Sequence, residues 1–324
     1  MYSFKELQQI SERELQKVAF NAEPKELYNP VKYILKIGGK RIRPSLLLAA
    51  YNLFKDDVET AIKPALALEV FHNFTLLHDD IMDKADIRRN QQTVHKKWNE
   101  NAAILSGDAM SIKAYELLAQ SPAEHLAEAL HAFNKTALEV CEGQQYDMNF
   151  ENRLDVSVDE YMEMIRLKTS VLLAVSLKIG AIVADASKTD IQNLYVFGLN
   201  LGLAFQLQDD YLDAFGNIHV FGKKIGGDIV ANKKTFLLIK ALETADAKTL
   251  KDLHRLIADT NIVEEQKITE VLNIYRQLEV DRLLKEKMAF YYKLAIESLN
   301  KLSVNKEKTQ ILKEFAEKLM NRES

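Results

Sequence analysis

The chain has no proline after Pro122, so its last 202 residues lack the residue type that most often ends a helix. The other four prolines lie in the first 65 residues, and only 11 glycines punctuate the whole sequence. Leu, Ala, Lys and Glu, which lose little side-chain freedom in a helix, dominate the remainder. The sequence therefore predicts an all-α fold, and one continuous helical domain is simpler than two domains joined by a linker.

Charge and hydropathy exclude several classes of function. Lys and Arg (43) nearly balance Asp and Glu (47), so no overall basic field indicates binding to nucleic acid. The longest apolar stretch, residues 170–186, is interrupted by Lys178 and Gly180 and is shorter than the roughly 20 residues that span a bilayer. The polar, amphipathic N-terminus does not resemble a secretory signal. We therefore expect a cytoplasmic protein without a transmembrane segment.

Two aspartate clusters share one spacing. The first, LLHDDIMD at residues 76–83, lies in an expected helix, which would place Asp79 and Asp83 on one face with Asp80 beside them. The second, FQLQDDYLD, carries the same spacing at Asp209, Asp210 and Asp213. Acidic solvent-exposed faces are the simpler interpretation of either cluster alone. Chance gives one such spacing in only about a few percent of chains of this length, however, and two far more rarely.

Carboxylates in such clusters are the hard oxygen ligands that Mg²⁺ prefers. This ion binds to one or two carboxylates, keeps several waters and takes its remaining ligands from substrate phosphates. Like charges within a cluster also repel, so a compensating cation is expected beside them. The two clusters therefore predict Mg²⁺ ions that hold a diphosphate between two helices.

Basic residues accompany both clusters. The turn GGKRIRP, at residues 38–44, sets three cations beside two glycines that allow a close backbone approach to an anion. Arg88 and Arg89 follow the first cluster, and their planar guanidinium groups match phosphate oxygens. Further lysines occur at residues 168, 224 and 233–234. Each basic segment alone is more simply a solvated surface, and it is their combination with the clusters that favours phosphate binding.

Seven motifs occur in one order along the chain: GGKRIRP, LLHDDIMD, ADIRRNQQTVH, GQQYD, RLKTS, FQLQDDYLD and KKIGGDIVANKKT. In these motifs, which run from about residue 38 to 235, the chain resembles the trans-isoprenyl diphosphate synthases, also called polyprenyl synthetases. Within that family it is similar to the short-chain farnesyl and geranylgeranyl diphosphate synthases. The resemblance implies a single polyprenyl synthetase domain over residues 1–324, folded as a large helical bundle of the isoprenoid synthase type with a central active-site cavity. It also implies a homodimer.

The resemblance further implies a reaction. Isopentenyl diphosphate would condense head to tail, in the trans configuration, with an allylic diphosphate, and diphosphate would be released. Several Mg²⁺ ions and the basic residues would stabilise the leaving diphosphate electrostatically. The released diphosphate would take the final proton, so no Ser-His-Asp or Cys-His nucleophile is required. The expected product is C20 geranylgeranyl diphosphate, with C15 farnesyl diphosphate next.

The resemblance also assigns roles to individual residues. Isopentenyl diphosphate would be held by Lys40, Arg43, His72 and Arg89. The allylic diphosphate would be held by Arg88, Lys168, Thr169, Gln206, Lys224 and Lys233. The metal ligands would be Asp79, Asp80, Asp83, Asp209, Asp210 and Asp213. The residues expected to act most directly in catalysis are Asp79, Asp80, Asp83, Asp209, Asp210, Lys168 and Lys224. Supporting positions would be Gln144, Asp147 and Asp228. For His72, an ordinary buried histidine is the alternative.

Phe74 is expected to limit the product length. It lies five residues before Asp79, about 7.5 Å along a helix axis. In the family a small residue at this position lets long products pass, and an aromatic one stops growth early. Ordinary core packing is the alternative for this side chain.

The chain departs from the family pattern in two loops. Asn90 and residues 91–92 stand where the family commonly has Gly-Lys-Pro, and Asn232 stands where it commonly has Gly. The charged residues are intact, but the conformation of both loops stays open.

Two other functions stay open as alternatives. A class I terpene cyclase also ionises a diphosphate with Mg²⁺, but it resembles this chain only in the first aspartate cluster. A non-catalytic regulatory subunit of a prenyltransferase would tolerate the loss of acidic or basic motif residues, which are all present here. The preferred allylic primer, the pathway and the number of metal ions do not follow from the sequence.

Overall fold

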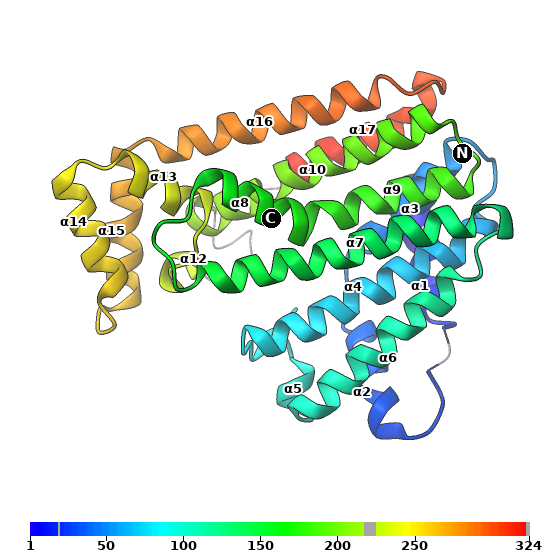
Figure 1. Ribbon diagram of the computed structural model, residues 1–324, viewed down its shortest axis with the longest axis horizontal. Coiled ribbons are helices and arrows are strands. Elements are labelled where there is room, and N and C mark those ends of the chain that lie inside the picture. The colour runs from blue at the N-terminus through cyan, green and yellow to red at the C-terminus, as the bar shows by residue number, and fades with distance from the viewer. Residues whose placement is uncertain (19, 217–224, 322–324) are drawn as a thin grey trace. The chain divides into compact units, whose positions relative to one another are not determined.

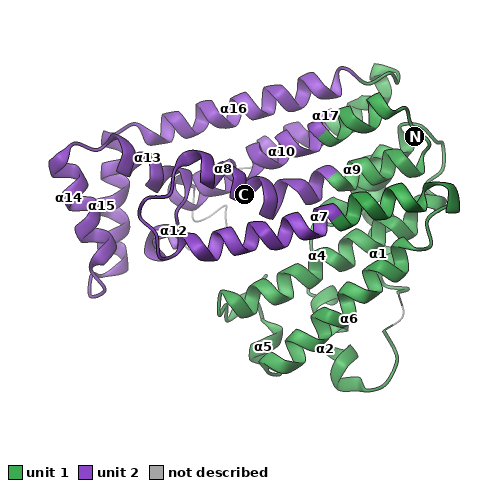
Figure 2. Cartoon of the chain, in the orientation of Figure 1, with its two compact units in different colours: residues 1–134, 175–195, 302–312 green, residues 135–174, 196–301, 313–324 purple. Residues whose placement is uncertain are grey.

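The computed structural model describes residues 1–18, 20–216 and 225–321, which are mostly helical and contain almost no strand (Figure 1). The predicted all-α fold is therefore confirmed. The chain divides into two compact units, which Figure 2 distinguishes by colour. Unit 1 comprises residues 1–134, 175–195 and 302–312, and unit 2 comprises residues 135–174, 196–301 and 313–324. The single domain over residues 1–324 stays a prediction.

Unit 1 contains the N-terminal elements. In chain order these are α1 (Phe4–Leu15), α2 (Lys25–Lys36), α3 (Ile42–Asn52), the 3-10 turn η1 (Glu59–Ala61), α4 (Ile62–Met82), the strands β1 (Ile87–Arg88) and β2 (Gln91–Gln92), α5 (Val94–Lys97) and α6 (Glu100–Leu118).

Unit 2 contains α8 (Val158–Ile165), the π-helical turn η2 (Arg166–Ser170), α12 (Gly227–Val230), α13 (Phe236–Thr244), α14 (Ala247–Ala258), α15 (Glu264–Gln277) and α16 (Val280–Leu299). Helices with residues in both units are α7 (Ala123–Phe150), α9 (Val171–Val183), α10 (Lys188–Phe215) and α17 (Lys306–Met320).

Helix α4 forms the centre of unit 1. It packs against α1, α3 and α6, and it is therefore apolar around most of its circumference. Its fully buried side chains include Leu66, Leu68, Val70 and Leu77. Pro64 stands in the first turn, where its missing N–H has no acceptor within the helix. This packing fixes the C-terminal end of α4, where the first aspartate cluster lies.

Helix α1 is held firmly at the edge of unit 1. It begins with a capping box, in which Ser3 and Glu6 satisfy each other's backbone N–H groups. Its buried side chains are Leu7, Ser11 and Leu15, which are spaced by four residues and face α3 and α4. The opposite face of α1 is polar, as expected for an amphipathic surface helix.

Unit 2 has a core of its own. Helices α8, α10, α13, α14, α15 and α16 contribute buried side chains to one apolar cluster, which includes Tyr161, Leu207, Leu253 and Leu284. Helix α13 packs on α8, α15 and α16. The aspartates of the second cluster lie near the C-terminal end of α10 and begin two residues after the buried Leu207. Among the described helices, none is both long enough and apolar enough to cross a membrane.

Candidate active site

The first aspartate cluster lies at the C-terminal end of helix α4. Asp79 and Asp80 lie in its last turn, and Asp83 is its C-cap. Carboxylates are unfavourable at a helix C-terminus, because this end carries the negative partial charge of the helix dipole. Burial adds to this, since Asp80 is only 1% exposed. Three acidic residues in this place therefore need positive charge nearby.

Arg88 supplies part of that charge. Its Nε donates a hydrogen bond of 2.8 Å to Asp80 Oδ1, and its Nη2 lies 3.7 Å from Asp79 Oδ2. Burial raises the pKa of Asp80, although the Arg88 charge and hydrogen bond act against this rise. The other oxygen, Asp80 Oδ2, is buried and has no hydrogen-bond donor among the described residues.

These features fit a divalent cation. A buried carboxylate oxygen without a donor is unfavourable, and a bound cation would satisfy it. In the part of the chain that the structure describes, no three His, Cys, Asp or Glu side chains gather closely enough to hold a metal ion. Mg²⁺ typically takes water or substrate oxygens as further ligands beside one or two carboxylates.

Arg43 and His72 form a pair in the same unit. Arg43 Nη1 lies 2.9 Å from His72 Nε2. Burial lowers the pKa of Arg43 to about 10, with the Arg89 charge acting in the same direction and that of Glu69 against it. Burial, followed by the Arg43 charge, holds the pKa of His72 well below its usual value. His72 is therefore neutral, and its Nε2 accepts the hydrogen bond from Arg43.

The arginine pair lies on a tight hairpin. Strands β1 and β2 are antiparallel and are joined by the two-residue turn Arg89–Asn90. Both turn residues have positive φ, 51° and 60°, as a type I′ hairpin turn requires. Asn tolerates this conformation better than other residues with a side chain. The departure from glycine at Asn90 is thus compatible with the turn, and Arg89 Nη1 donates a hydrogen bond to the carbonyl of Gly38.

Phe74 belongs to a row of aromatic rings in unit 1. Its ring centroid lies 4.8 Å from that of His78 and 5.4 Å from that of Phe71. The row continues from Phe71 to Phe133 at 5.0 Å and from Phe133 to Tyr115 at 5.1 Å. Sequence analysis did not single out Phe71, although it lies three residues before Phe74 on α4. It also missed Phe133 and Tyr115, whose separation from α4 along the chain hides their contact.

In unit 2, Lys168 and Thr169 lie in the π-helical turn η2. Such turns are rare and often occur at functional sites. Two glycines make room for it: a Cβ on Gly143 would lie 2.3 Å from the Lys168 backbone nitrogen, and a Cβ on Gly202 would lie 2.6 Å from Ser170 Cα. Neither glycine was assigned a role from the sequence, although Gly143 begins the GQQYD motif.

A chain of hydrogen bonds leads from η2 to the second aspartate cluster. Thr169 Oγ1 donates to Gln206 Oε1 at 3.1 Å, and Gln206 Nε2 donates to Asp210 Oδ1 at 3.2 Å. The Tyr161 hydroxyl donates to Asp210 Oδ2. Lys168 Nζ donates to Asp147 Oδ2 at 2.5 Å. Tyr161, which sequence analysis missed, thus helps to fix the orientation of the Asp210 carboxylate.

These groups line a cavity of about 140 Å³ within unit 2. It brings together the predicted residues Asp147, Lys168, Thr169, Gln206, Asp210, Asp228 and Lys233. Burial raises the pKa of Asp210 to about 8, and the Asp228 charge adds to this rise while the Tyr161 and Gln206 hydrogen bonds oppose it. A buried acid with a raised pKa beside lysines is typical of a functional site.

Asp213 and Asn232 shape the loop that carries Lys233. Asp213 Oδ2 accepts a hydrogen bond of 3.0 Å from the backbone N–H of Asp228, so this side chain also holds the start of α12. Asn232 has a φ of 53°, and its Oδ1 accepts a 2.7 Å hydrogen bond from the buried Lys267. A positive φ explains why glycine is common here and why asparagine can replace it. Lys267 was not singled out from the sequence.

The predicted residues thus gather in two groups. In unit 1, Arg88 lies against Asp79 and Asp80, Arg43 pairs with His72, and Arg89 meets the turn that carries Lys40. In unit 2, the predicted residues named above line one cavity. Lys224 lies outside the described residues. Whether the two aspartate clusters act on one diphosphate stays a prediction.

Comparisons with known proteins agree with the motifs. A family model described as polyprenyl synthetase matches residues 24–275. A short chain isoprenyl diphosphate synthase of Methanocaldococcus jannaschii is 43% identical over 252 residues, which cover 78% of this chain and 76% of that protein. A geranylgeranyl diphosphate synthase of Sulfolobus acidocaldarius is 38% identical over 284 residues, 86% of this chain and 85% of that protein. A crystal structure of geranylgeranyl pyrophosphate synthetase from Pyrococcus horikoshii matches with a TM-score of 0.92 and 32% identity, covering 98% of each chain.

Proposed function

Because the chain belongs to the polyprenyl synthetase family, we propose that it condenses isopentenyl diphosphate with an allylic diphosphate, head to tail and in the trans configuration. The reaction releases diphosphate and gives a short-chain polyprenyl diphosphate. C20 is the proposed product and C15 the second choice, a ranking supported by the similarity to two geranylgeranyl diphosphate synthases. The observation that carries the proposal is the unit 2 cavity, which gathers lysines, a buried aspartate and hydrogen-bond donors from motifs far apart in the sequence.

The allylic diphosphate is the proposed ligand of one group of residues: Arg88, Lys168, Thr169, Gln206, Lys224 and Lys233. Lys168 and Lys233 line the unit 2 cavity and would offset the negative charge that develops on the leaving diphosphate. The apolar side chains around the site would keep water away from the allylic carbocation.

Mg²⁺ is the proposed cofactor, with several ions in each active site. Its ligands would be Asp79, Asp80, Asp83, Asp209, Asp210 and Asp213. Bound Mg²⁺ would supply further charge neutralisation for the leaving diphosphate. The buried, donor-free oxygen of Asp80 supports this assignment within the described part of unit 1.

Isopentenyl diphosphate is the proposed ligand of Lys40, Arg43, His72 and Arg89. The guanidinium groups would bind its phosphate oxygens, and neutral His72 would orient Arg43 rather than add charge. Fixed in this way, isopentenyl diphosphate would present its double bond to the allylic carbocation. The released diphosphate would then remove the proton, so no protein base is required.

A homodimer is the proposed assembly. Helix α6 exposes Ile104, Leu105, Ile112 and Tyr115, of which Leu105 is 60% and Ile112 is 70% exposed. An apolar stretch of this kind on one helix suits a second copy of the chain. The single domain over residues 1–324 and the cytoplasmic location stay predictions.

The experiment is a condensation assay. Purified protein is incubated with Mg²⁺, labelled isopentenyl diphosphate and dimethylallyl, geranyl or farnesyl diphosphate in turn, and the extracted products are sized. Linear C20 or C15 products are expected, and Asp210→Asn should abolish most of the turnover. Cyclic products would favour the terpene cyclase alternative. No condensation with any primer would reject the synthase function and favour the regulatory subunit.

A further inference from the structure

The backbone of the GGKRIRP turn is held in an unusual conformation. Gly38 and Gly39 have φ values of 91° and 154°, and Arg41 has a φ of 47°. The left-handed region is unfavourable for a residue with a side chain, so the surroundings of Arg41 must hold it in this conformation.

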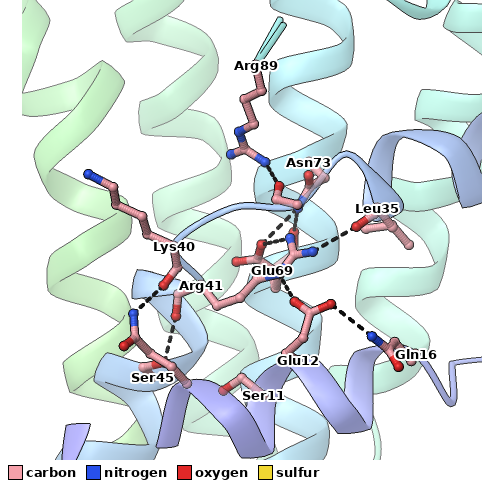
Figure 3. A network of polar contacts seen from close by, with 12 residues as sticks. Ser11, Glu12, Gln16, Leu35, Lys40, Arg41, Ser45, Glu69, Asn73 and Arg89 are labelled. Carbon is pink, nitrogen blue, oxygen red and sulfur yellow. Dashed lines mark hydrogen bonds and ion pairs between the residues drawn. The ribbon is translucent and has the colours of Figure 1, made fainter. Parts of the chain in front are cut away.

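The contacts of the Arg41 side chain account for this backbone conformation. It is buried, and each of its three guanidinium nitrogens donates a hydrogen bond of 2.7 Å: Nε to Glu12, Nη1 to Glu69 and Nη2 to the carbonyl of Leu35 (Figure 3). Because of these contacts, the Arg41 side chain points into the protein interior. Figure 3 shows the Lys40 side chain extending away from this network. Arg41 therefore shapes the turn, and Lys40 is the neighbour directed elsewhere.

Helix α1 holds the turn at two points. Glu12 accepts from Arg41, and Gln8 Nε2 donates a 2.6 Å hydrogen bond to the carbonyl of Lys40. Gln8 and Glu12 are four residues apart and lie on one face of α1. The helix itself is anchored by its buried side chains against α3 and α4. Its polar face thus holds the backbone of Lys40 and the side chain of Arg41, two consecutive residues of the turn.

Glu69 connects this network to the other cations. Its side chain is buried on α4, and its charge raises the pKa of Arg41, Arg43 and Arg89 against the effect of burial. Asn73 donates a 3.1 Å hydrogen bond to the same carboxylate oxygen that Arg41 contacts. Glu69 therefore holds Arg41 directly, and its charge favours the charged forms of Arg43 and Arg89 in their buried surroundings.

We propose that α1 is a positioning element of the isopentenyl diphosphate site, in which Gln8 and Glu12 fix the turn that aims Lys40 and Arg43. The inference rests on the proposed function. The family model begins at residue 24, so α1 lies outside the part of the chain that this model matches. Gln8 and Glu12 are positioning residues, since their contacts are with the turn.

The test measures three variants: Gln8→Ala, Glu12→Gln and the double variant that combines them. Each is compared with the control variant Glu14→Gln. Glu14 is the matched control, because it lies on the same helix but pairs only with Arg13 and Lys17 in the described contacts. We expect the KM for isopentenyl diphosphate to rise roughly 10-fold in Glu12→Gln and further in the double variant, because the cations are misplaced. The KM for the allylic diphosphate and the behaviour of Glu14→Gln should not change. An unchanged KM for isopentenyl diphosphate in the double variant, or an equal rise for both substrates, would overturn the proposal.

A second measurement separates this inference from the proposed function. If the unaltered protein condenses nothing, the proposed function fails. The role of Gln8 and Glu12 in fixing the turn can still be tested by amide hydrogen exchange without substrate. Exchange in the segment 38–43 should be faster in Glu12→Gln and Gln8→Ala than in Glu14→Gln. Identical exchange in all three variants would show that α1 does not fix the turn.

Discussion

Gly143→Ala is expected to damage activity far more than stability. The added Cβ would lie 2.3 Å from the Lys168 backbone nitrogen, about 1 Å closer than the 3.4 Å at which ordinary contacts begin. Either α7 or the turn η2 must therefore move by about that distance. Overpacking of this kind lowers the free energy of unfolding by about 1–3 kcal/mol, and the higher helix propensity of alanine offsets about 1 kcal/mol of this loss. A displacement of about 1 Å at a catalytic group, by contrast, lowers the rate about 100-fold.

Gly180→Ala is the matched control for this variant. A Cβ there would lie 2.2 Å from the carbonyl oxygen of Leu47, so the overlap is just as severe, but neither residue belongs to η2 or to an aspartate cluster. Both variants should lose a few degrees in Tm, measured by differential scanning fluorimetry. Only Gly143→Ala should lose about 100-fold in kcat/KM for the allylic diphosphate, measured with isopentenyl diphosphate at saturation.

Equal kcat/KM in the two variants at a similar loss of Tm would refute this reasoning. Gly202→Ala provides an independent check, because its Cβ would approach Ser170 Cα from α10, on another side of the turn. The effect should therefore recur in Gly202→Ala. Its absence there would mean that packing of α7, rather than the shape of η2, explains the first result.

Three further predictions concern single residues. The pKa of Asp210 is raised to about 8 in the folded protein, so this residue destabilises the fold increasingly as pH rises from about 4 to 8. Without metal, Asp210→Asn should therefore have the same Tm as the unaltered protein near pH 4 and a higher Tm at pH 8, where its free energy of unfolding should be larger by about 2 kcal/mol or more. An equal Tm at pH 8 would contradict this. Phe74→Ala should shift the products beyond C20 in chromatographic sizing, whereas Phe74→Tyr should not, and an unchanged product in the alanine variant would reject Phe74 as the limit. Asn232→Ala should destabilise by about 1–2 kcal/mol more than Asn232→Gly in urea unfolding, because both lose the contact with Lys267 but only glycine accepts the positive φ without strain. The reverse order would contradict the importance of φ at this position.

The helical fold and the family could be predicted from the sequence. The scarcity of proline predicted the helices correctly, and the resemblance to the polyprenyl synthetases is confirmed. The Asp79–Asp80 pair was expected to need a cation, and Arg88 lies against it. These successes have a local cause, because helix periodicity and residue type along a short segment determine them.

What the sequence could not show depends on contacts between distant segments. RLKTS looks like ordinary helix, and its π-helical turn is accommodated by Gly143 and Gly202 on other helices. Asn90 and Asn232 looked like departures from a pattern, but their positive φ values make them conservative replacements for glycine. Arg41 looked like one more phosphate-binding cation, yet its partners are Glu12, Glu69 and a backbone carbonyl.

The buried network around Arg41 bears on how stability and activity trade off in this protein. Ion pairs in an apolar interior are seldom the most stable choice, and well-packed apolar side chains in their place often stabilise a protein by about 1–4 kcal/mol. A fold selected for stability alone would therefore fill the space between α1 and α4 with leucine or methionine rather than with Arg41 and Glu69. Removing either charge singly would leave its partner buried without compensation, so the two positions can change together far more easily than one at a time. Replacing both residues together with apolar side chains should therefore raise the heat resistance of this enzyme while lowering its turnover.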